Sequence, residues 1–199
     1  MPQQRTRLLG SILGICSAAL LLVGCGGGQP GATPPQHQAQ EATQTSGTFE
    51  GFQPNAKAIT YNPAQVPVGA RIDVSAESAE GKTKVIIHLQ GLQPNRGYGA
   101  HVHTKPCGAK GDDAGPHYQE KADPVKPSVD PAYANPRNEV WLDFHTDAQG
   151  NGTSTAEGTW TLTTREDAKS VVIHETPTHH EPGKAGTAGG RLSCVTADF

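Results

Sequence analysis

The segment His101-Val102-His103 places two imidazole side chains two positions apart. Side chains at positions i and i+2 of a β-strand point to the same face, so a single metal ion could bind both of these histidines. An HxH pair alone also fits two ordinary surface histidines. The motif therefore needs support from other parts of the chain.

Two later segments add further histidines. Gly115-Pro-His117-Tyr follows a loop rich in glycine and aspartate, and Ser170-Val-Val-Ile-His174-Glu is a β-branched run with a histidine at its polar end. Near the end of the chain stands Ala188-Gly-Gly-Arg191-Leu-Ser-Cys194. Together with the HxH segment, these blocks resemble the copper/zinc superoxide dismutase family, whose signatures include GLxP…GxHxH, GPH, VVxHE and AGxRLxC. The four blocks occur in the family's order between residues 91 and 194.

The resemblance implies a set of site residues and a reaction. His101, His103 and His174 match the permanent copper ligands, and His117 matches the histidine that bridges copper and zinc. Four imidazoles are an all-nitrogen set, which suits one Cu(II) ion. The implied reaction is dismutation of superoxide to oxygen and hydrogen peroxide by alternate reduction and oxidation of the copper, with His117 also passing a proton. Arg191 matches the arginine that guides the anionic substrate.

The chain departs from the family at the zinc site. Residues 118–140 contain no histidine, so the usual zinc site cannot be assembled, and we expect zinc to be absent, as in the copper-only branch. A carboxylate should then orient His117 in place of zinc. Glu120, Glu139 and Asp143 are the candidates, of which we favour Glu139 and Asp143.

Other polar residues near these motifs have ordinary explanations. His145 lies beyond the zinc-loop position, and we interpret it as structural. The adjacent His179 and His180 are typical of a solvated loop, with secondary copper capture as the alternative. Lys105 and Lys184 are indistinguishable from other surface lysines.

The beginning of the chain predicts export and lipid attachment. Arg5 and Arg7 precede an apolar run, residues 8–23, that is too short for a convincing membrane span and is typical of a signal peptide. Leu22-Val-Gly-Cys25 resembles a bacterial lipobox, in which Cys25 carries the lipid. We therefore expect a signal peptide over residues 1–24 and a location in the cell envelope, on the extracytoplasmic face of the membrane.

Residues 25–47 contain almost no large apolar side chain and predict a lipidated cysteine followed by a disordered tether, in which His37 is solvated. Residues 48–199 then form a single domain. From Thr48 onward the chain has 14 Lys and Arg against 18 Asp and Glu, and it lacks a basic block. Nucleic acid is therefore not an expected partner, and the oligomeric state is left open.

Cysteine usage agrees with export. Cys16 falls in the signal peptide and Cys25 is the lipid site, which leaves Cys107 and Cys194 as an even pair in an oxidising compartment. We expect them to form a disulfide that ties the loop after the HxH strand to the segment carrying Arg191.

Short strand-like runs alternate with turn clusters, and no helical period occurs, which predicts an all-β sandwich or barrel. In the third run Val85, Ile87 and Leu89 should face the core, with His88 on the surface. The family resemblance makes the fold an eight-stranded Greek-key barrel, with the site built by two loops, residues 104–139 and 176–190. The expected strands are 58–61, 70–76, 82–89, 98–103, 140–146, 153–162, 170–174 and 191–196.

Two functions follow from these patterns. The first is an exported, membrane-tethered superoxide dismutase that uses copper. The alternative is a non-enzymatic copper-binding module of the same fold that buffers or delivers the metal. Arg191 discriminates between the two, because metal storage has no need of a residue that guides an anion.

Overall fold

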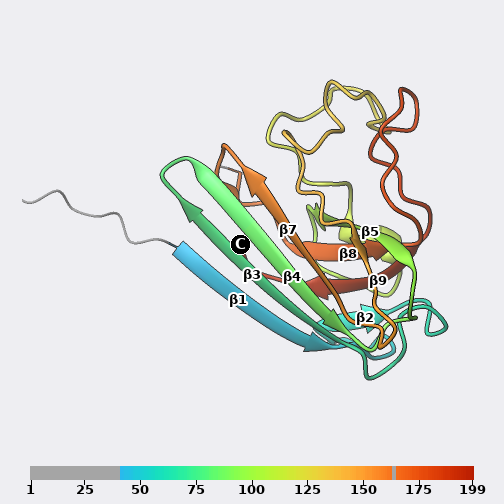
Figure 1. Cartoon of the computed structure of the whole chain (residues 1–199). Coiled ribbons are helices and arrows are strands. Elements are labelled where there is room, and N and C mark those ends of the chain that lie inside the picture. Colours follow the sequence, from blue (N-terminus) through green and yellow to red (C-terminus); the bar gives the residue numbers. More distant parts are fainter. Residues whose placement is uncertain (1–40, 163–164) are drawn as a thin grey trace, which may run out of the picture. The chain divides into compact units, whose positions relative to one another are not determined.

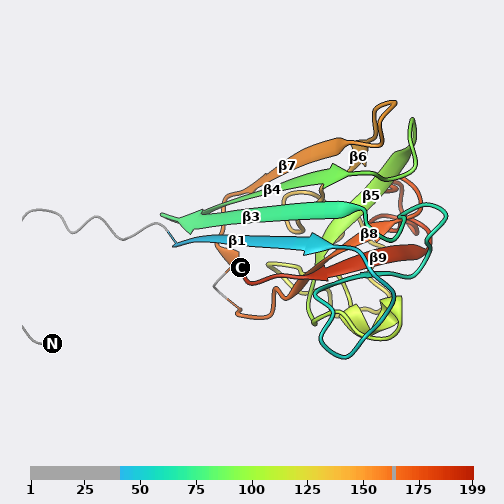
Figure 2. The same cartoon turned by 90° about the horizontal axis from the view of Figure 1, so that it is seen from below.

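Two antiparallel sheets face each other across an apolar core in the computed structural model, which describes residues 41–162 and 165–199 (Figure 1). The first sheet has the order β1 (Glu41–Thr48), β3 (Arg71–Ala79), β4 (Lys82–Gln90), β7 (Gly152–Gly158), and these strands lie side by side in Figure 2. The second has the order β2 (Ala58–Thr60), β9 (Arg191–Thr196), β8 (Ser170–His174), β5 (Gly97–His103), β6 (Phe144–His145).

The all-β expectation is confirmed. The described residues form nine strands rather than eight, together with one 3₁₀ turn, η1 (Gly111–Ala114). The chain crosses between the sheets after β1, β2, β4, β6 and β7. The two sheets remain separate ladders, so the fold is a sandwich rather than a closed barrel. None of the helical segments among the described residues has the length and apolar character needed to cross a membrane.

Alternation along β4 shows why the sheets pack. Val85, Ile87 and Leu89 are at most 1% exposed, whereas His88 is exposed, as predicted. Burying each such aliphatic side chain contributes about 1.5–3 kcal/mol relative to leaving it in water. On the opposite sheet Tyr98 stacks on Phe144 with ring centroids 5.1 Å apart. These contacts fix β5, and therefore its two histidines, within the sandwich.

The expected tether is wrong for residues 41–47, because they form β1, an edge strand paired with β3 along its whole length. An edge strand can be stabilised by its backbone ladder without large apolar side chains. Here Thr43, Thr45 and Gly47 are the partly buried positions. A Cβ at Gly47 would lie 2.6 Å from the Cβ of Ala58, so the close approach of β2 requires glycine. The signal segment, Cys25 and His37 lie outside the described residues.

Two expected strands differ in extent. Residues 140–146 lie beside β5, but only Phe144 and His145 form a ladder with it. The contact between His101 and Trp141 is an isolated bridge. The strand expected over 153–162 ends at Gly158, where the Trp160 ring packs over the backbone. The other six expected strands occur close to their predicted limits.

Pairing of β5 with β8 brings distant parts of the sequence together. His101 stands opposite Val172, and His174 stands opposite Gly99. The long loop (residues 104–139) and the short loop (residues 176–190) lie next to each other beyond these strands (Figure 1). The architecture therefore brings the β-strands that carry His101, His103 and His174 next to the two loops.

Candidate metal centre

Four histidines converge at the edge of the second sheet. His101 and His103 come from β5, His174 ends β8, and His117 lies in the long loop. A bridge between His103 and His117 holds that loop against β5. Each ring offers one nitrogen, and the four nitrogens lie within 4.8 Å of one another. The structure thus brings together the four histidines expected from the sequence.

The second ring nitrogen of His103 has a backbone partner. His103 Nδ1 donates to the carbonyl oxygen of Gly115 at 2.9 Å. Its Nε2 is therefore the nitrogen that carries a lone pair, and it lies 3.3 Å from Nε2 of His174. Gly115 adopts φ +73°, a conformation that favours glycine. The sequence places a glycine where the carbonyl must turn toward the site.

His101 is oriented by a relay through Thr178. Thr178 Oγ1 donates to Oδ1 of Asp143 at 2.6 Å, and it lies 2.8 Å from Nε2 of His101. A hydroxyl has one hydrogen, so toward His101 it can only accept. Nε2 of His101 therefore carries the proton. His101 Nδ1 is left buried with no hydrogen-bond partner, as expected of a nitrogen that faces a metal ion.

His117 is oriented by Glu139. Its Nδ1 lies 2.8 Å from Oε2 of Glu139, whose side chain is 2% exposed. Of the three candidate carboxylates, Glu139 is the one that contacts His117. Asp143 acts on His101 instead, and Glu120 is 3.5 Å from the hydroxyl of Tyr118.

Burial keeps three of the rings neutral. It lowers the pKa of His101 and of His103 well below the ordinary value, and the neighbouring histidines add to both shifts. For His174, burial followed by His117 and Arg191 lowers the pKa to about 3. The Gly189 carbonyl opposes that shift slightly, although Nδ1 of His174 makes no hydrogen bond within ordinary limits. Neutral imidazoles are the form that binds metal.

The donor set fits a transition-metal ion. Bonds from a metal to imidazole nitrogen are about 2.0–2.1 Å long, so nitrogens on opposite sides of one ion stand about 4 Å apart. The observed spread of 4.8 Å needs only a small contraction to reach that value. An all-imidazole set suits Cu(II) or Zn(II) rather than magnesium or calcium. Among the residues that the structure describes, this is the one group of three or more such side chains able to hold a metal.

A cavity of about 660 Å³ opens onto His117 and His174. Arg191 lines it, and its Nη1 donates to the carbonyls of Gly111 at 2.9 Å and Gly115 at 2.8 Å. Partial burial lowers the pKa of Arg191, an effect that Asp112 opposes, and the guanidinium stays charged. Arg191 therefore presents a fixed positive charge to the cavity.

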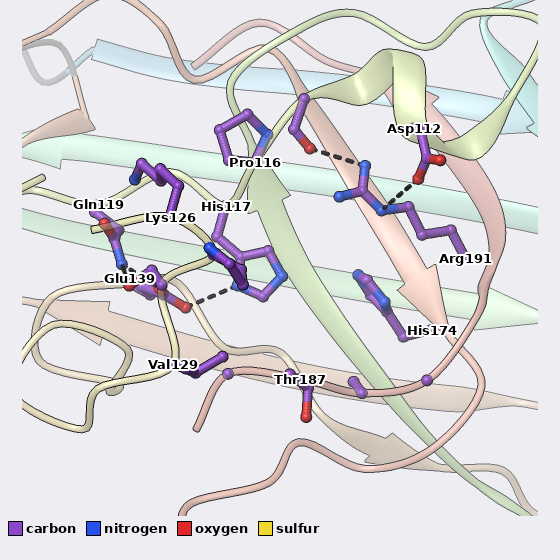
Figure 3. A pocket seen from close by; sticks show the side chains of 16 residues that line it. Asp112, Pro116, His117, Gln119, Lys126, Val129, Glu139, His174, Thr187 and Arg191 are labelled. Carbon is purple, nitrogen blue, oxygen red and sulfur yellow. Dashed lines mark hydrogen bonds and ion pairs between the residues drawn. The ribbon is translucent and has the colours of Figure 1, made fainter. Parts of the chain in front are cut away.

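Lys126 is a second cationic residue of the cavity wall. Figure 3 shows Arg191 and Lys126 on either side of His117. An anion entering the cavity therefore meets positive charge from both the long loop and β9.

The expected disulfide is confirmed between Cys107 and Cys194. It joins the start of the long loop to β9, three positions after Arg191, and the Cys107 amide also donates to Thr196 Oγ1 at 3.0 Å. The loop that supplies both carbonyl partners of Arg191 is thus tied to the strand that carries Arg191.

Several other polar residues lie apart from the centre, as expected. His145 and His88 are exposed and belong to no metal-binding group. His179 pairs with Glu181 at 3.1 Å, and Lys184 stands 4.0 Å from the same carboxylate. The remaining loop histidine, His180, packs edge-on against Trp141.

Sequence reasoning missed four residues of the site: Thr178, Gln119, Trp141 and Lys126. Thr178 contacts His101 from 77 positions away, and Trp141 donates to Glu139 at 2.7 Å. Thr, Gln, Trp and Lys in loops have many uses, so their types alone carried no signal. Only the identification of Glu139 would have directed attention to Gln119 and Trp141.

Comparison with known proteins agrees with this geometry. The model of the family described as copper/zinc superoxide dismutase matches residues 68–196. The structure is similar to that of the Cu/Zn superoxide dismutase from Brucella abortus, with 18% sequence identity, a TM-score of 0.52, and coverage of 77% of this chain and 98% of that one. A double mutant of a superoxide dismutase-like protein from Bacillus subtilis matches with 19% identity and a TM-score of 0.46, covering 63% of this chain and 88% of that one. No curated protein matches the chain.

Proposed function

Because the chain belongs to the copper/zinc superoxide dismutase family, we propose that it is a copper-dependent superoxide dismutase of the copper-only branch. The observation that carries the proposal is the convergence of four imidazoles beside a cavity lined by Arg191. A store for copper needs the imidazoles alone. A catalyst for a small anion also needs a path to the metal and a charge that guides the anion.

Copper held by His101, His103, His117 and His174 would supply the one-electron chemistry, accepting an electron from one superoxide and giving it to a second. The protein supplies position, access and protons. His101 and His103 are fully buried, whereas His117 is 16% exposed and lines the cavity. Since Nδ1 of His117 contacts Glu139, Nε2 is the atom at which this ring can pass a proton to a reduced substrate.

The proposal of a single copper ion rests on what faces His117. In a two-metal site the second nitrogen of this histidine would bind zinc. Here that nitrogen meets the carboxylate of Glu139, and among residues 41–162 and 165–199 the four histidines are the one group of three or more His, Cys, Asp or Glu side chains placed to hold a metal. A carboxylate that accepts the Nδ1 proton can orient the ring in place of a second metal.

Arg191 is proposed to steer superoxide, with Lys126 adding to the field. The cavity wall holds these two cations and two carboxylates: Glu139 is buried in hydrogen bonds, and Asp112 stands 3.8 Å from Nε of Arg191. On a protein of net charge −3, cations placed beside the site raise the encounter rate of a small anion.

We further propose that the protein is exported and held by a lipid on Cys25 at the extracytoplasmic face of the membrane, where it removes superoxide. The lipobox-like Leu22-Val-Gly-Cys25 supports this. Cys25→Ser should shift the protein from the membrane fraction to the soluble fraction and abolish incorporation of labelled palmitate. Unchanged fractionation and labelling would exclude the anchor.

The test of the enzymatic proposal is competition for superoxide between copper-loaded protein and cytochrome c, in parallel with metal analysis. We expect one copper per chain and catalytic removal of superoxide. One tightly bound copper without turnover would favour the buffering module instead.

A further inference from the structure

We propose that Trp141 and Gln119 are positioning residues, which clamp Glu139 from both sides and so fix the proton of His117 on Nδ1. The inference rests on the proposed function in one respect only, namely that Nε2 of His117 then faces the copper ion. The clamp itself consists of this chain's own contacts.

Glu139 accepts hydrogen bonds on both carboxylate oxygens. Trp141 Nε1 lies 2.7 Å from Oε2, the same oxygen that His117 Nδ1 approaches at 2.8 Å. Gln119 Nε2 lies 2.7 Å from Oε1. Glu139 is 2% exposed, so these three groups, rather than water, satisfy its charge.

The two clamping residues donate to Glu139. Indole Nε1 can only donate, so Trp141 cannot be the acceptor. Gln119 Oε1 accepts from the backbone amide of Asp123 at 2.9 Å, which turns its amide nitrogen toward Glu139. A carboxylate that already accepts on both oxygens has no hydrogen to donate, so as a carboxylate Glu139 requires a proton on Nδ1 of His117.

Both clamping residues are held in turn by their surroundings. Gln119 Nε2 also donates to Ser128 Oγ at 2.9 Å, and Ser128 donates to Asp123 at 2.7 Å. Trp141 packs edge-on against His101 and His180, with ring centroids 6.0 and 5.0 Å away.

Loop geometry leaves little freedom around the carboxylate. A Cβ on Gly186, which adopts φ +79°, would come within 3.1 Å of Ala134 and 3.7 Å of Glu139 Oε2. The short loop thus closes over Glu139 at close range. The clamp holds Glu139 in one position, and Glu139 in turn holds His117.

The experiment follows the ring N–H protons of metal-free, ¹⁵N-histidine-labelled protein by NMR. Trp141→Phe keeps the ring but removes the donor, and Gln119→Met keeps the length but removes the amide. In each variant we expect solvent exchange of the His117 Nδ1 proton to rise about tenfold, the factor that corresponds to one lost hydrogen bond of ordinary strength. The Nδ1 proton of His103, which is bound to Gly115 instead, should exchange at its original rate.

Trp160→Phe is the matched control, because it makes the same chemical change in the other tryptophan, whose Nε1 donates to the Arg137 carbonyl. It should leave the His117 proton unaffected. Cu(II)-loaded Trp141→Phe should also show altered EPR parameters, which those of Trp160→Phe should not.

The proposal is overturned if both clamp variants keep the His117 proton protected, or if all ring protons, including that of His103, exchange faster together. Because the NMR readout uses metal-free protein, it is independent of whether the copper-loaded protein removes superoxide. Copper-loaded wild-type protein without dismutase activity would contradict the proposed function. It would not contradict the proposal that Trp141 and Gln119 position Glu139.

Discussion

His103 and Arg191 share one hydrogen-bond acceptor, the carbonyl oxygen of Gly115, at 2.9 and 2.8 Å respectively. Arg191, which would guide the substrate, and His103, which would hold the metal, are therefore positioned by the same backbone atom. Replacing Arg191 can therefore change both the guidance of the anion and the position of His103. Substitutions that keep or remove the positive charge test the guidance of the anion.

Arg191→Lys should preserve the charge and most of the dependence of kcat/KM on ionic strength. Arg191→Gln should lower kcat/KM about tenfold at low ionic strength and flatten its salt dependence, because the guiding charge is gone. Lys126→Gln should show a smaller effect of the same sign. Rates are measured by pulse radiolysis over a series of salt concentrations.

Lys184→Gln is the control, since Lys184 is exposed and stands next to Glu181. If Arg191→Gln retained the wild-type rate and salt slope, steering by Arg191 would be wrong.

Glu139→Gln should weaken copper binding about 10- to 100-fold, the usual cost of removing the partner of a metal-binding histidine. The substitution is isosteric but places an amide NH₂ against the donors that surround this position. Copper affinity is measured by competition with a chelator of known affinity. Glu120→Gln changes a carboxylate in the same loop and should bind copper like the wild type. Equal affinities for the two variants would reject Glu139 as the residue that orients His117.

Thr178→Val should weaken copper binding as well, by about tenfold or more, because it cuts the relay from Asp143 to His101. Valine keeps the shape of threonine and removes the hydroxyl. The Nε2 proton of His101 would lose its acceptor. Thr187→Val makes the same change in a hydroxyl that contacts the Lys184 carbonyl, and it should be silent. A wild-type copper affinity in Thr178→Val would show that the relay is dispensable.

Metal-free protein should lose stability as the pH falls below about 6.5. The folded state holds His174 with a pKa near 3, so between these values the unfolded chain binds more protons than the folded one. The contribution of this histidine to the free energy of unfolding is then fully present above pH 6.5. It falls with decreasing pH, by up to about 1.4 kcal/mol per pH unit for each such histidine.

Urea unfolding at pH 7.5, 6.0 and 5.0 measures how the free energy of unfolding changes with pH. Replacing His174 with asparagine should make this dependence on pH weaker. A wild-type stability that stays constant from pH 7.5 to 5.0 would contradict the assignment of buried neutral rings.

Local patterns in the sequence were sufficient to predict most of the architecture. The alternation in residues 82–89 reflects one buried face, whereas the β-branched run that ends at His174 is buried along its whole length. β1 escaped prediction because an edge strand stabilised by backbone pairing needs no large apolar side chains. Its threonines and glycine resemble a linker in composition.

The candidate site was predictable where its residues lie in motifs that resemble a known family. His101, His103, His117 and His174 were identifiable from those motifs, whereas residue type alone did not separate them from the five other histidines of the chain. The choice among Glu120, Glu139 and Asp143 was not, because it depends on the bridge between Gln119 and Glu139 that brings the long loop back on itself. Contacts of this kind within a loop produce no repeating pattern in the sequence.

Four imidazoles are proposed to hold one copper ion. Pulsed EPR of Cu(II)-loaded protein labelled with ¹⁵N-histidine measures it most directly, because each equatorial imidazole contributes its own nitrogen couplings. We predict one copper per chain with four histidine nitrogens, and three when His117 is replaced by glutamine. A spectrum dominated by oxygen ligands or backbone nitrogen, or one unchanged by replacement of His117, would contradict the account.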